Sequence, residues 1–435
     1  MSLRFGTDGV RGVALTELTT DLAACLGRAA VEVLGGEQWL IGRDPRESGS
    51  VLAEAVAAGV RAAGSEPIDV GILPTPALAW LSQTRGLPAA MITASHNPWS
   101  DNGVKVFAAG GLKLGDAVEA AIEAGLHDGR APVGAAVSAP TVLDGAAPYV
   151  AHLVATSDRL DGLHVVLDTA HGAMHAVAPA VVRALGARVE VIHDTPDGRN
   201  INHECGATHT AALSAAVVER GADLGLAFDG DGDRVIAVDH EGRVVDGDRL
   251  IALAALHLRD RGQLHHDTVV VTVMSNLGFH RAMAANGVEV VTTAVGDRYV
   301  LEALDAGGFS VGGEQSGHVI YRDLATTGDG LLAGLQLAAF LRDRGEPLAR
   351  LAAEVMTSFP QVLVNVRVAD RHPHAADELA DEIRTAQERL GADGRILVRA
   401  SGTEPLIRVM VEAAEHDEAR AVADGLAAVV AERFG

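Results

Sequence analysis

The sequence predicts an α/β protein whose last part is a smaller α+β region. Two observations lead to this prediction. Segments with helical spacing of apolar residues alternate with short apolar runs that are typical of buried parallel strands. This pattern restarts at His164 and again at Thr268, so we expect three similar α/β blocks with helices on both faces of mixed or parallel sheets.

The first block is expected to begin with an amphipathic helix over residues 20–34, which Gly35 and Gly36 end. A short apolar strand at 39–42 and a helix capped by Ser48 follow. The remaining elements expected in this block are strands 67–72 and 89–93 and a helix at 77–83.

The next two blocks repeat the alternation of strand and helix. The second is expected to contain strands 164–168, 188–192 and 223–228. One helix follows its first strand and ends near residue 185, and a second helix spans 211–220. The third is expected to contain strands 268–273, 288–292 and 309–311 and helices 277–286 and 298–306.

The last segment has a different order, because two strands follow each other directly. We expect strands 362–368, 396–399 and 407–412 and helices 375–390 and 418–434, with a partly antiparallel sheet. The domains are therefore predicted to span 1–148, 149–247, 248–360 and 361–435.

Composition excludes several functional classes. The net charge of −23 over 435 residues argues against non-specific binding of nucleic acid or of an anionic membrane. The apolar stretch 331–341 is too short to span a bilayer, and the first residues lack a basic leader with an apolar core. Cys25 and Cys205 stand far apart, so we expect neither a disulfide framework nor a zinc site based on cysteines. These features favour a soluble cytoplasmic protein.

The first group of reactive side chains is the segment 95–98 (Ser-His-Asn-Pro), directly after an expected strand. Open α/β sheets place their sites at this end of a strand. A serine becomes a nucleophile when a histidine or lysine next to it takes its proton. Turn signals at 97–98 and 102–103 would let a loop bring Lys105 back to Ser95. The alternative is an ordinary polar turn.

The second group is the segment 229–234 (Asp-Gly-Asp-Gly-Asp-Arg), between two apolar runs. Its three carboxylates can converge on a hard divalent cation, and Mg²⁺ is the expected one beside phosphate. An exposed acidic turn is the alternative. An EF-hand loop is excluded, because Arg234 and His240 stand where that loop requires glycine and glutamate.

Three further loops carry polar side chains that suit a phosphorylated sugar. The segment 312–318 offers groups that read hydroxyls, or it is a polar surface loop. The segment 399–408 has two arginines around a Ser-Gly-Thr turn. These residues can bind a phosphate, and the alternative is an ordinary hairpin whose two arginines lie on the surface. The segment 4–12 forms a loop with two arginines before the first helix, and its alternative is a simple turn.

Together, and in this order, the five segments resemble the α-D-phosphohexomutase superfamily over the whole chain. The segments 6–12 and 313–318, with Gln315, and the segment 296–299 are similar to the branch that acts on glucosamine phosphates. The resemblance implies a four-domain, heart-shaped enzyme with one loop from each domain in a central cleft. It implies interconversion of glucosamine 6-phosphate and glucosamine 1-phosphate through a hexosamine 1,6-bisphosphate, for UDP-N-acetylglucosamine synthesis.

The resemblance also implies roles for individual residues. Ser95 carries a phosphoryl group, and one Mg²⁺ is held by a phosphoserine oxygen with Asp229, Asp231 and Asp233. Positive charge at the serine comes from Arg234 with Arg11 or Lys105, and the general base is Lys105 or His96. Glu314 and Ser316 read ring hydroxyls, and the far phosphate binds Arg399, Ser401, Gly402, Thr403 and Arg408.

Other functions remain open from the sequence. A mutase for glucose or mannose phosphates would carry nearly the same residues, because only the sugar loop separates the branches. A phosphatase would let water take the phosphoryl group from Ser95. A binding protein would use the same loops without phosphorylating Ser95. The partner in each case is a small sugar phosphate, and the oligomeric state stays open, with a homodimer as one alternative.

Overall fold

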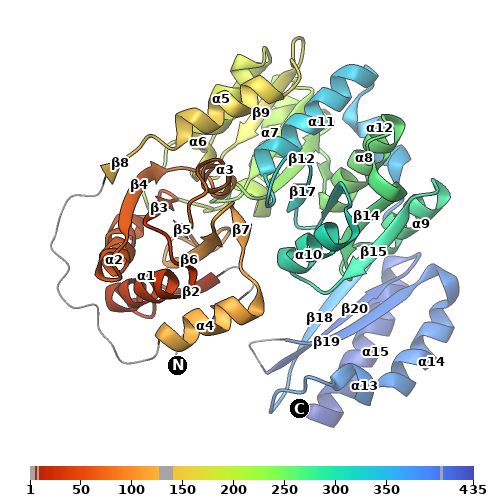
Figure 1. Cartoon of the computed structure of the whole chain (residues 1–435). Coiled ribbons are helices and arrows are strands. Elements are labelled where there is room, and N and C mark those ends of the chain that lie inside the picture. Colours follow the sequence, from red (N-terminus) through yellow and green to blue (C-terminus); the bar gives the residue numbers. More distant parts are fainter. Residues whose placement is uncertain (1–4, 7–8, 127–140, 402–404) are drawn as a thin grey trace. The chain divides into compact units, whose positions relative to one another are not determined.

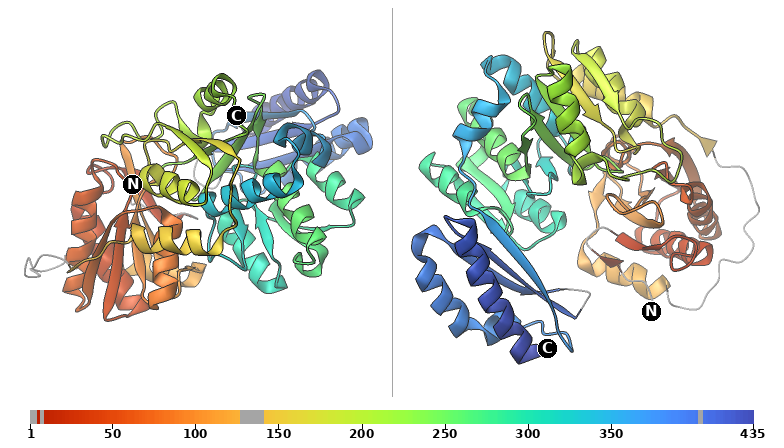
Figure 2. Two further views of the ribbon diagram at one scale, coloured as in Figure 1. Left: turned by 90° about the horizontal axis from the view of Figure 1, so that it is seen from above. Right: turned by 180° about the vertical axis from the view of Figure 1, so that it is seen from behind.

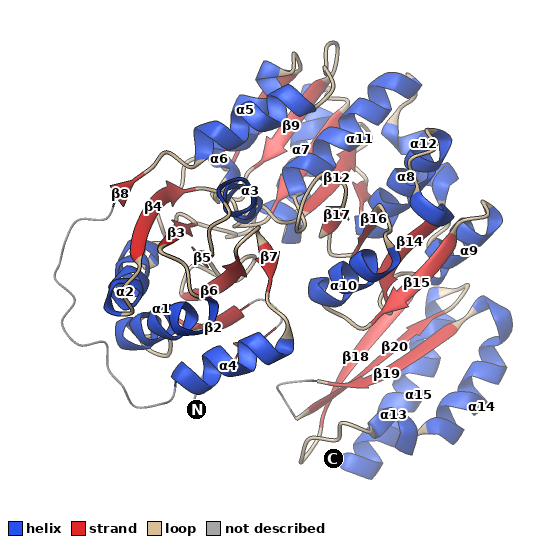
Figure 3. Cartoon of the chain, in the orientation of Figure 1, coloured by secondary structure: helices blue, strands red, loops and turns tan. Residues whose placement is uncertain are grey.

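The computed structural model describes residues 5–6, 9–126, 141–401 and 405–435. These residues form two compact units (Figure 1). The first comprises residues 1–274 and 288–353, and the second comprises 275–287 and 354–435. Figure 3 shows strands and helices alternating through most of the chain, which confirms the predicted α/β class. None of the described helices is both long and apolar enough to cross a membrane.

The first sheet of the first unit has the strand order β1-β2-β6-β5-β3-β4-β8, with β7 paired to β6. Strands β5, β3, β4 and β8 are parallel, whereas β6 is antiparallel to β5 and β2 is antiparallel to β6. Its strands are β1 (Phe5–Gly6), β2 (Gly9–Val13), β3 (Gln38–Arg43), β4 (Glu66–Ile72), β5 (Ala89–Ile92), β6 (Asp101–Ala108), β7 (Leu112–Lys113) and β8 (Thr141–Val142). Its helices are α1 (Thr20–Leu34), α2 (Gly49–Ala62), α3 (Thr75–Arg85), α4 (Asp116–Leu126) and α5 (Ala146–Thr156).

Glycines allow α1 and α2 to pack backbone to backbone on one face of this sheet (Figure 1). A Cβ on Gly27 would lie 2.4 Å from the carbonyl oxygen of Val56, and one on Gly59 would lie 1.9 Å from that of Ala24. Any larger side chain would therefore push the helices apart. The core beneath them contains Trp39, which is fully buried.

The first unit contains two further sheets, in the orders β10-β9-β11-β12-β13 and β15-β14-β16-β17. In each, parallel strands are followed by an antiparallel edge. The strands are β9 (His164–Asp168), β10 (Arg188–Ile192), β11 (Leu224–Phe228), β12 (Val235–Asp239), β13 (Val244–Val245), β14 (Thr268–Thr272), β15 (Glu289–Thr293), β16 (Val311–Gly313) and β17 (Val319–Tyr321). The helices are α6 (Met174–Ala184), α7 (Ala211–Arg220), α8 (Gly247–Asp260), α10 (Asp297–Gly307), α11 (Gly330–Arg344) and α12 (Leu348–Val355), the last of which crosses into the second unit.

The second unit is built on an antiparallel sheet with the order β18-β20-β19. Helices α14 and α15 lie side by side against this sheet (Figure 2). Its strands are β18 (Gln361–Arg367), β19 (Arg395–Ala400) and β20 (Leu406–Glu412), and its helices are α9 (Leu277–Ala285), α13 (Ala375–Glu378), α14 (Ala380–Leu390) and α15 (His416–Phe434).

Four sequence predictions were wrong in detail. Asn102 and Gly103 lie inside strand β6 and form no turn. Ser48 stands at the N-cap position of α2, but its hydroxyl forms no capping hydrogen bond and instead accepts one from the Asn102 side chain at 2.9 Å. The predicted helix 375–390 is broken at Leu379 into α13 and α14. The described part of the segment 4–12 forms strands β1 and β2, and Arg4, Thr7 and Asp8 lie outside the described residues.

Candidate active site

Ser95 lies in a buried turn directly after strand β5. Its side chain is 1% exposed, and its φ of 52° is in the left-handed region, where a residue other than glycine stores strain. The backbone N–H of Ser95 donates to the Thr93 hydroxyl at 2.9 Å. The Ser95 hydroxyl itself donates to Oδ2 of Asp229 at 2.6 Å. The surrounding structure therefore fixes both the backbone and the oxygen of the predicted nucleophile.

Two polar side chains hold the carbonyl oxygens of this serine loop, residues 95–101. The buried guanidinium of Arg46 donates to the carbonyls of Ser95 and Asn97 at 2.9 and 2.8 Å. It is itself paired with the buried carboxylate of Asp44 at 2.9 Å. From the loop between β10 and α7, the Asn202 amide donates to the same two carbonyls at 2.8 and 3.0 Å. Sequence reasoning missed Arg46 and Asn202, because their sequence context gives no sign of this role.

The aspartate loop, residues 229–234, connects the antiparallel strands β11 and β12. Asp229, Asp231 and Asp233 are all buried, and one carboxylate oxygen from each lies within 4.8 Å of the other two. A Cβ on Gly230 would lie 2.5 Å from the carbonyl oxygen of Ser95, so this loop and the serine loop touch along their backbones. The predicted convergence of the three carboxylates is present in the structure.

These carboxylates fit a hard divalent cation. Buried charges of one sign repel each other unless a cation balances them. Within the described residues, Oδ1 of Asp231 is buried and has no hydrogen-bond partner, which leaves an oxygen available for a metal. Oxygen donors of this kind suit Mg²⁺ better than a softer metal.

Lys105 partly balances the carboxylates. Its ammonium donates to Oδ2 of Asp231 at 2.8 Å and to Oδ2 of Asp233 at 2.9 Å. Burial alone would raise the pKa of Asp233, but the Lys105 charge holds it well below the usual range. Burial, with the charges of Asp233 and Asp231, raises the pKa of Asp229 well above the usual range. His318 and Arg234 also lower the pKa of Asp233, so Lys105 supplies only part of the positive charge at the loop. It reaches the carboxylates from strand β6, and the predicted turn at 102–103 plays no part.

His96 lies beside the serine hydroxyl, with Nδ1 3.4 Å from the Ser95 Oγ. Burial, and then the charges of Arg234 and Arg11, lower the pKa of His96 to about 4. The imidazole is therefore neutral at neutral pH and can accept a proton. Arg11 comes from strand β2, and Arg234 follows the aspartate loop. The charges of both arginines thus act on the imidazole beside Ser95.

The sugar loop, residues 312–318, turns between strands β16 and β17. Glu314 accepts a hydrogen bond from the Gly296 backbone at 3.1 Å, and Ser316 is exposed beside it. Among the described residues, neither side chain forms a hydrogen bond or an ion pair with the serine loop. His318 is the member of this loop that lies close to the aspartate loop, with Nδ1 3.7 Å from Oδ1 of Asp233.

The arginine hairpin of the second unit consists of strands β19 and β20. Arg399 and Arg408 are direct partners across the antiparallel pair. Burial, and then the charge of Arg408, lower the pKa of Arg399. Ser401 is buried at the end of β19, and its backbone N–H donates to the Leu406 carbonyl at 2.7 Å. Gly402 and Thr403 lie outside the described residues.

Comparison with known proteins gives a family for the chain. Four phosphoglucomutase/phosphomannomutase models match it: alpha/beta/alpha domain I at residues 2–132, domain II at 147–242, domain III at 246–359 and the C-terminal domain at 363–429. The phosphoglucosamine mutase of Rhodococcus opacus is 54% identical and that of Kineococcus radiotolerans is 52% identical. The matches cover 99% and 100% of this chain and 100% of each relative.

Solved structures agree with this family. A phosphoglucomutase/phosphomannomutase family protein from Burkholderia thailandensis superposes with a TM-score of 0.84 at 27% identity, over 99% of this chain and 97% of that chain. The N-acetylphosphoglucosamine mutase of Aspergillus fumigatus, in complex with GlcNAc-6P and magnesium, has a TM-score of 0.71 at 20% identity, over 100% and 96%. The second comparison supports the fold alone.

Proposed function

The chain belongs to the phosphoglucomutase/phosphomannomutase family, and on this premise we propose that it acts as a phosphoglucosamine mutase. It interconverts glucosamine 6-phosphate and glucosamine 1-phosphate, the latter for synthesis of UDP-N-acetylglucosamine. The identity of 52–54% over the whole chain to proteins of that name supports the substrate. The Ser95 hydroxyl, held 2.6 Å from one carboxylate of a buried triad, is the single observation that supports the chemistry.

Ser95 carries the phosphoryl group that is transferred. In its phosphorylated form, the bond between phosphorus and the serine oxygen breaks as a sugar hydroxyl forms a new bond to phosphorus. The hydroxyl proton goes to His96, whose imidazole is neutral, or to Lys105 after its ammonium has given up a proton to solvent. The product is a hexosamine 1,6-bisphosphate, which returns its other phosphoryl group to Ser95. Transfer of this kind depends mainly on positioning and on neutralising charge.

Phosphorylation of Ser95 adds further negative charge beside Asp229, so the proposal includes one Mg²⁺. Asp229, Asp231 and Asp233 would hold the ion together with an oxygen of phosphoserine. When bound, Mg²⁺ neutralises charge on the phosphoryl oxygens. Arg11 and Arg234, whose charges act on His96, add positive charge on that side.

The remaining predicted residues bind the rest of the substrate. The Glu314 carboxylate accepts hydrogen bonds from ring hydroxyls, and the Ser316 hydroxyl donates to them or accepts from them. The far phosphate is assigned to the arginine hairpin, because two half-buried guanidinium groups side by side need an anion. The full set in this role is Arg399, Ser401, Gly402, Thr403 and Arg408. A cytoplasmic location is part of the proposal, because charged sugar phosphates do not cross a bilayer unaided.

The proposal is tested by ³¹P NMR of the full-length protein with Mg²⁺ and a trace of hexose 1,6-bisphosphate. Glucosamine 6-phosphate, glucose 6-phosphate and mannose 6-phosphate are supplied in separate samples. We expect the 1-phosphate resonance to grow fastest from glucosamine 6-phosphate. Faster conversion of the glucose or mannose ester would assign the chain to the other branch. Release of inorganic phosphate alone would indicate a phosphatase, and no conversion by protein whose intact mass shows phosphoserine would overturn the transfer mechanism.

A further inference from the structure

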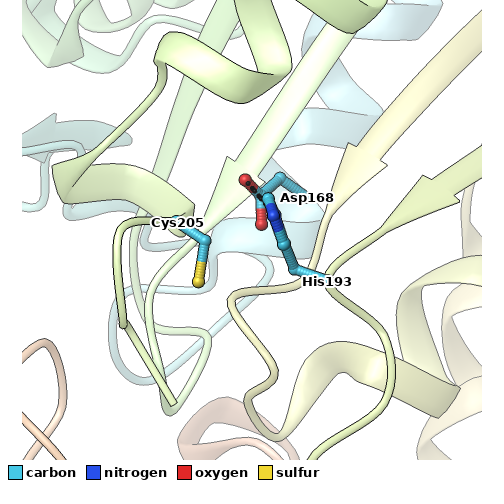
Figure 4. Close-up of side chains that lie close together, drawn as sticks. All are labelled: Asp168, His193 and Cys205. Carbon is cyan, nitrogen blue, oxygen red and sulfur yellow. Dashed lines mark ion pairs between the residues drawn. The ribbon is translucent and has the colours of Figure 1, made fainter. Parts of the chain in front are cut away.

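Three side chains with different ligand chemistry meet at the carboxyl edge of the second sheet (Figure 4). Asp168 is the last residue of β9, and His193 follows β10 directly. The two strands are parallel, with Ile192 opposite Asp168, so their ends lie together. Cys205 comes from the loop before α7 and is fully buried. This group is separate in sequence from every loop used by the proposed mutase chemistry.

The atoms that could bind a metal are already close. Nδ1 of His193 lies 3.0 Å from Oδ2 of Asp168. The sulfur of Cys205 and one ligand atom from each of the other two residues all lie within 4.8 Å of one another. Tetrahedral zinc, with bonds of about 2.0–2.3 Å, separates its ligand atoms by roughly 3.3–3.8 Å. Small side-chain adjustments would therefore be enough to bring the three ligands onto one ion.

Hydrogen bonds around the group hold the Asp168 side chain and the main chain of His193 in place. The buried Asp168 carboxylate accepts hydrogen bonds from the N–H groups of Ala170 and Gly206 at 2.9 and 3.0 Å. The carbonyl of His193 accepts from the His171 N–H at 2.7 Å and from the Thr169 hydroxyl at 2.8 Å. Such outer contacts orient ligands in known metal sites.

We propose that Asp168, His193 and Cys205 form a second metal site, which binds a soft divalent cation of the Zn²⁺ type with water as the fourth ligand. A carboxylate, an imidazole and a thiolate together suit zinc and are a poor set for Mg²⁺. The His193 ring is 27% exposed and forms the solvent side of the group, whereas its Nδ1 is buried. The site uses a single cysteine, so it differs from the zinc site built on both cysteines that the sequence spacing excluded.

Without a metal, the buried thiol of Cys205 is not a nucleophile. Burial, and then the charge of Asp168, raise the pKa of Cys205 to about 12, so the metal-free thiol stays protonated and unreactive. On binding, the sulfur–metal bond replaces the sulfur–hydrogen bond, and the proton leaves to solvent.

The position of the site gives it a link to the serine loop. Cys205 lies three residues after Asn202, whose amide holds the carbonyls of Ser95 and Asn97. The Asn202 backbone N–H also donates to the carbonyl of Ala170, at 2.9 Å, beside Asp168. A bound ion would tie this loop to the ends of β9 and β10, and would thereby stiffen the support of the serine loop.

The chain contains only two cysteines, which provide a matched control. Co²⁺ is titrated alone into the full-length protein, and the absorption band of a thiolate–cobalt bond is followed. The aspartate loop can bind Co²⁺ only through oxygen, so it gives no such band. We expect the band at one equivalent in the wild type and in Cys25→Ala, and its loss in Cys205→Ala. No band in the wild type, or a band that survives in Cys205→Ala, would overturn the proposal.

A second variant covers the case in which Cys205→Ala fails to fold. His193→Asn keeps a residue that tolerates the left-handed φ of 53°. We expect it to fold, with a melting temperature below that of the metal-free wild type because the buried Asp168 carboxylate loses its partner, and to bind Zn²⁺ at least about 10-fold more weakly, measured by competition with a coloured chelator. Equal affinity of variant and wild type would refute the site, whatever the mutase assay shows.

Discussion

The aspartate loop and the arginine hairpin are both clusters of like charge. They differ in the sign of that charge and in whether a side chain of opposite charge pairs with it. The three buried carboxylates of the first have Lys105 between them. In the second, Arg408 has Arg399 on one side and the uncharged Asn365 on the other. Like charges directly opposite across strands destabilise a sheet. Each cluster thus costs stability in a way that a bound ion of opposite charge would relieve.

The comparison shows how a charged cluster can indicate its ligand. The aspartate loop is fully buried and partly neutralised, which suits a small cation held permanently in one geometry. The arginines are half-buried and stay accessible, which suits an anion that enters and leaves with the substrate. We therefore expect changes in the first cluster to affect the chemical step and changes in the second to affect binding.

The largest effect is expected for Ser95→Ala, because alanine offers no oxygen to carry the phosphoryl group. Mutase activity should fall by at least about 10⁴-fold, measured by ³¹P NMR with glucosamine 6-phosphate. Ser100→Ala changes a serine in the same loop and should keep activity close to that of the wild type. Substantial activity in Ser95→Ala, with Ser100→Ala as the reference, would remove the nucleophile from the mechanism.

Asp229→Asn should separate metal binding from folding. Mg²⁺ at 100 times its Kd should stabilise the wild type by about 2.7 kcal/mol, and this gain should be largely lost in the variant. Without metal, the variant should melt close to the wild type, because the neutral amide keeps an acceptor for the Ser95 hydroxyl and is not repelled by Asp231 and Asp233. Thermal melts with Mg²⁺ and with a chelator measure both effects, with Asp343→Asn on α11 as the surface control. An equal gain in wild type and variant would place the metal elsewhere.

Arg408→Ala should mainly weaken binding. Loss of a charged hydrogen bond to phosphate, worth about 1.5–3 kcal/mol, corresponds to a KM increase of roughly 10- to 100-fold. The value of kcat should change less, and Arg367→Ala, an exposed arginine on β18, should leave KM unchanged. If Arg408→Ala lowers kcat and leaves KM alone, the arginine hairpin does not anchor phosphate.

The smallest effect is expected for Arg199→Ala. This arginine is exposed, and it is already paired with the Glu47 carboxylate at 2.8 Å. Exposed pairs of this kind contribute little. Melting temperature and kinetic constants should match those of the wild type, in contrast to Arg408, which faces a like charge. A KM increase comparable to that of Arg408→Ala would show that positive charge in general, and not the paired arginines, determines affinity.

The sequence predicted most regular elements, because their hydrophobic patterns are local. It missed strand β6, because an Asn-Gly pair at 102–103 is typical of a turn. In the structure both residues are buried, and β6 pairs with β2 on one side and with β5 on the other. Tertiary pairing here outweighs local turn preference. The break at Leu379 was also missed, because residues 375–390 keep a helical pattern across it.

The reactive side chains were easier to find than their supports. Ser95 and the three aspartates stand in short, unusual motifs. Arg46 and Asn202 act through contacts with residues about 50 and 100 positions away, and no local pattern encodes such a pairing. The group at Asp168 was invisible for the same reason, since parallel strand order brings its members together from three separate segments.

The close approach at Gly230 has a consequence for protein engineering. A side chain there would meet the carbonyl of Ser95 at 2.5 Å and the amide of Asn202 at 2.8 Å. The serine loop, the aspartate loop and the loop that contains Asn202 therefore pack against one another at Gly230 with no space for a side chain. A chimera that takes residues 1–148 from a distant homologue has to import the matching backbone at 201–202 and 229–231 as well. Recombination in this part of the chain should succeed only when all three loops are inherited together.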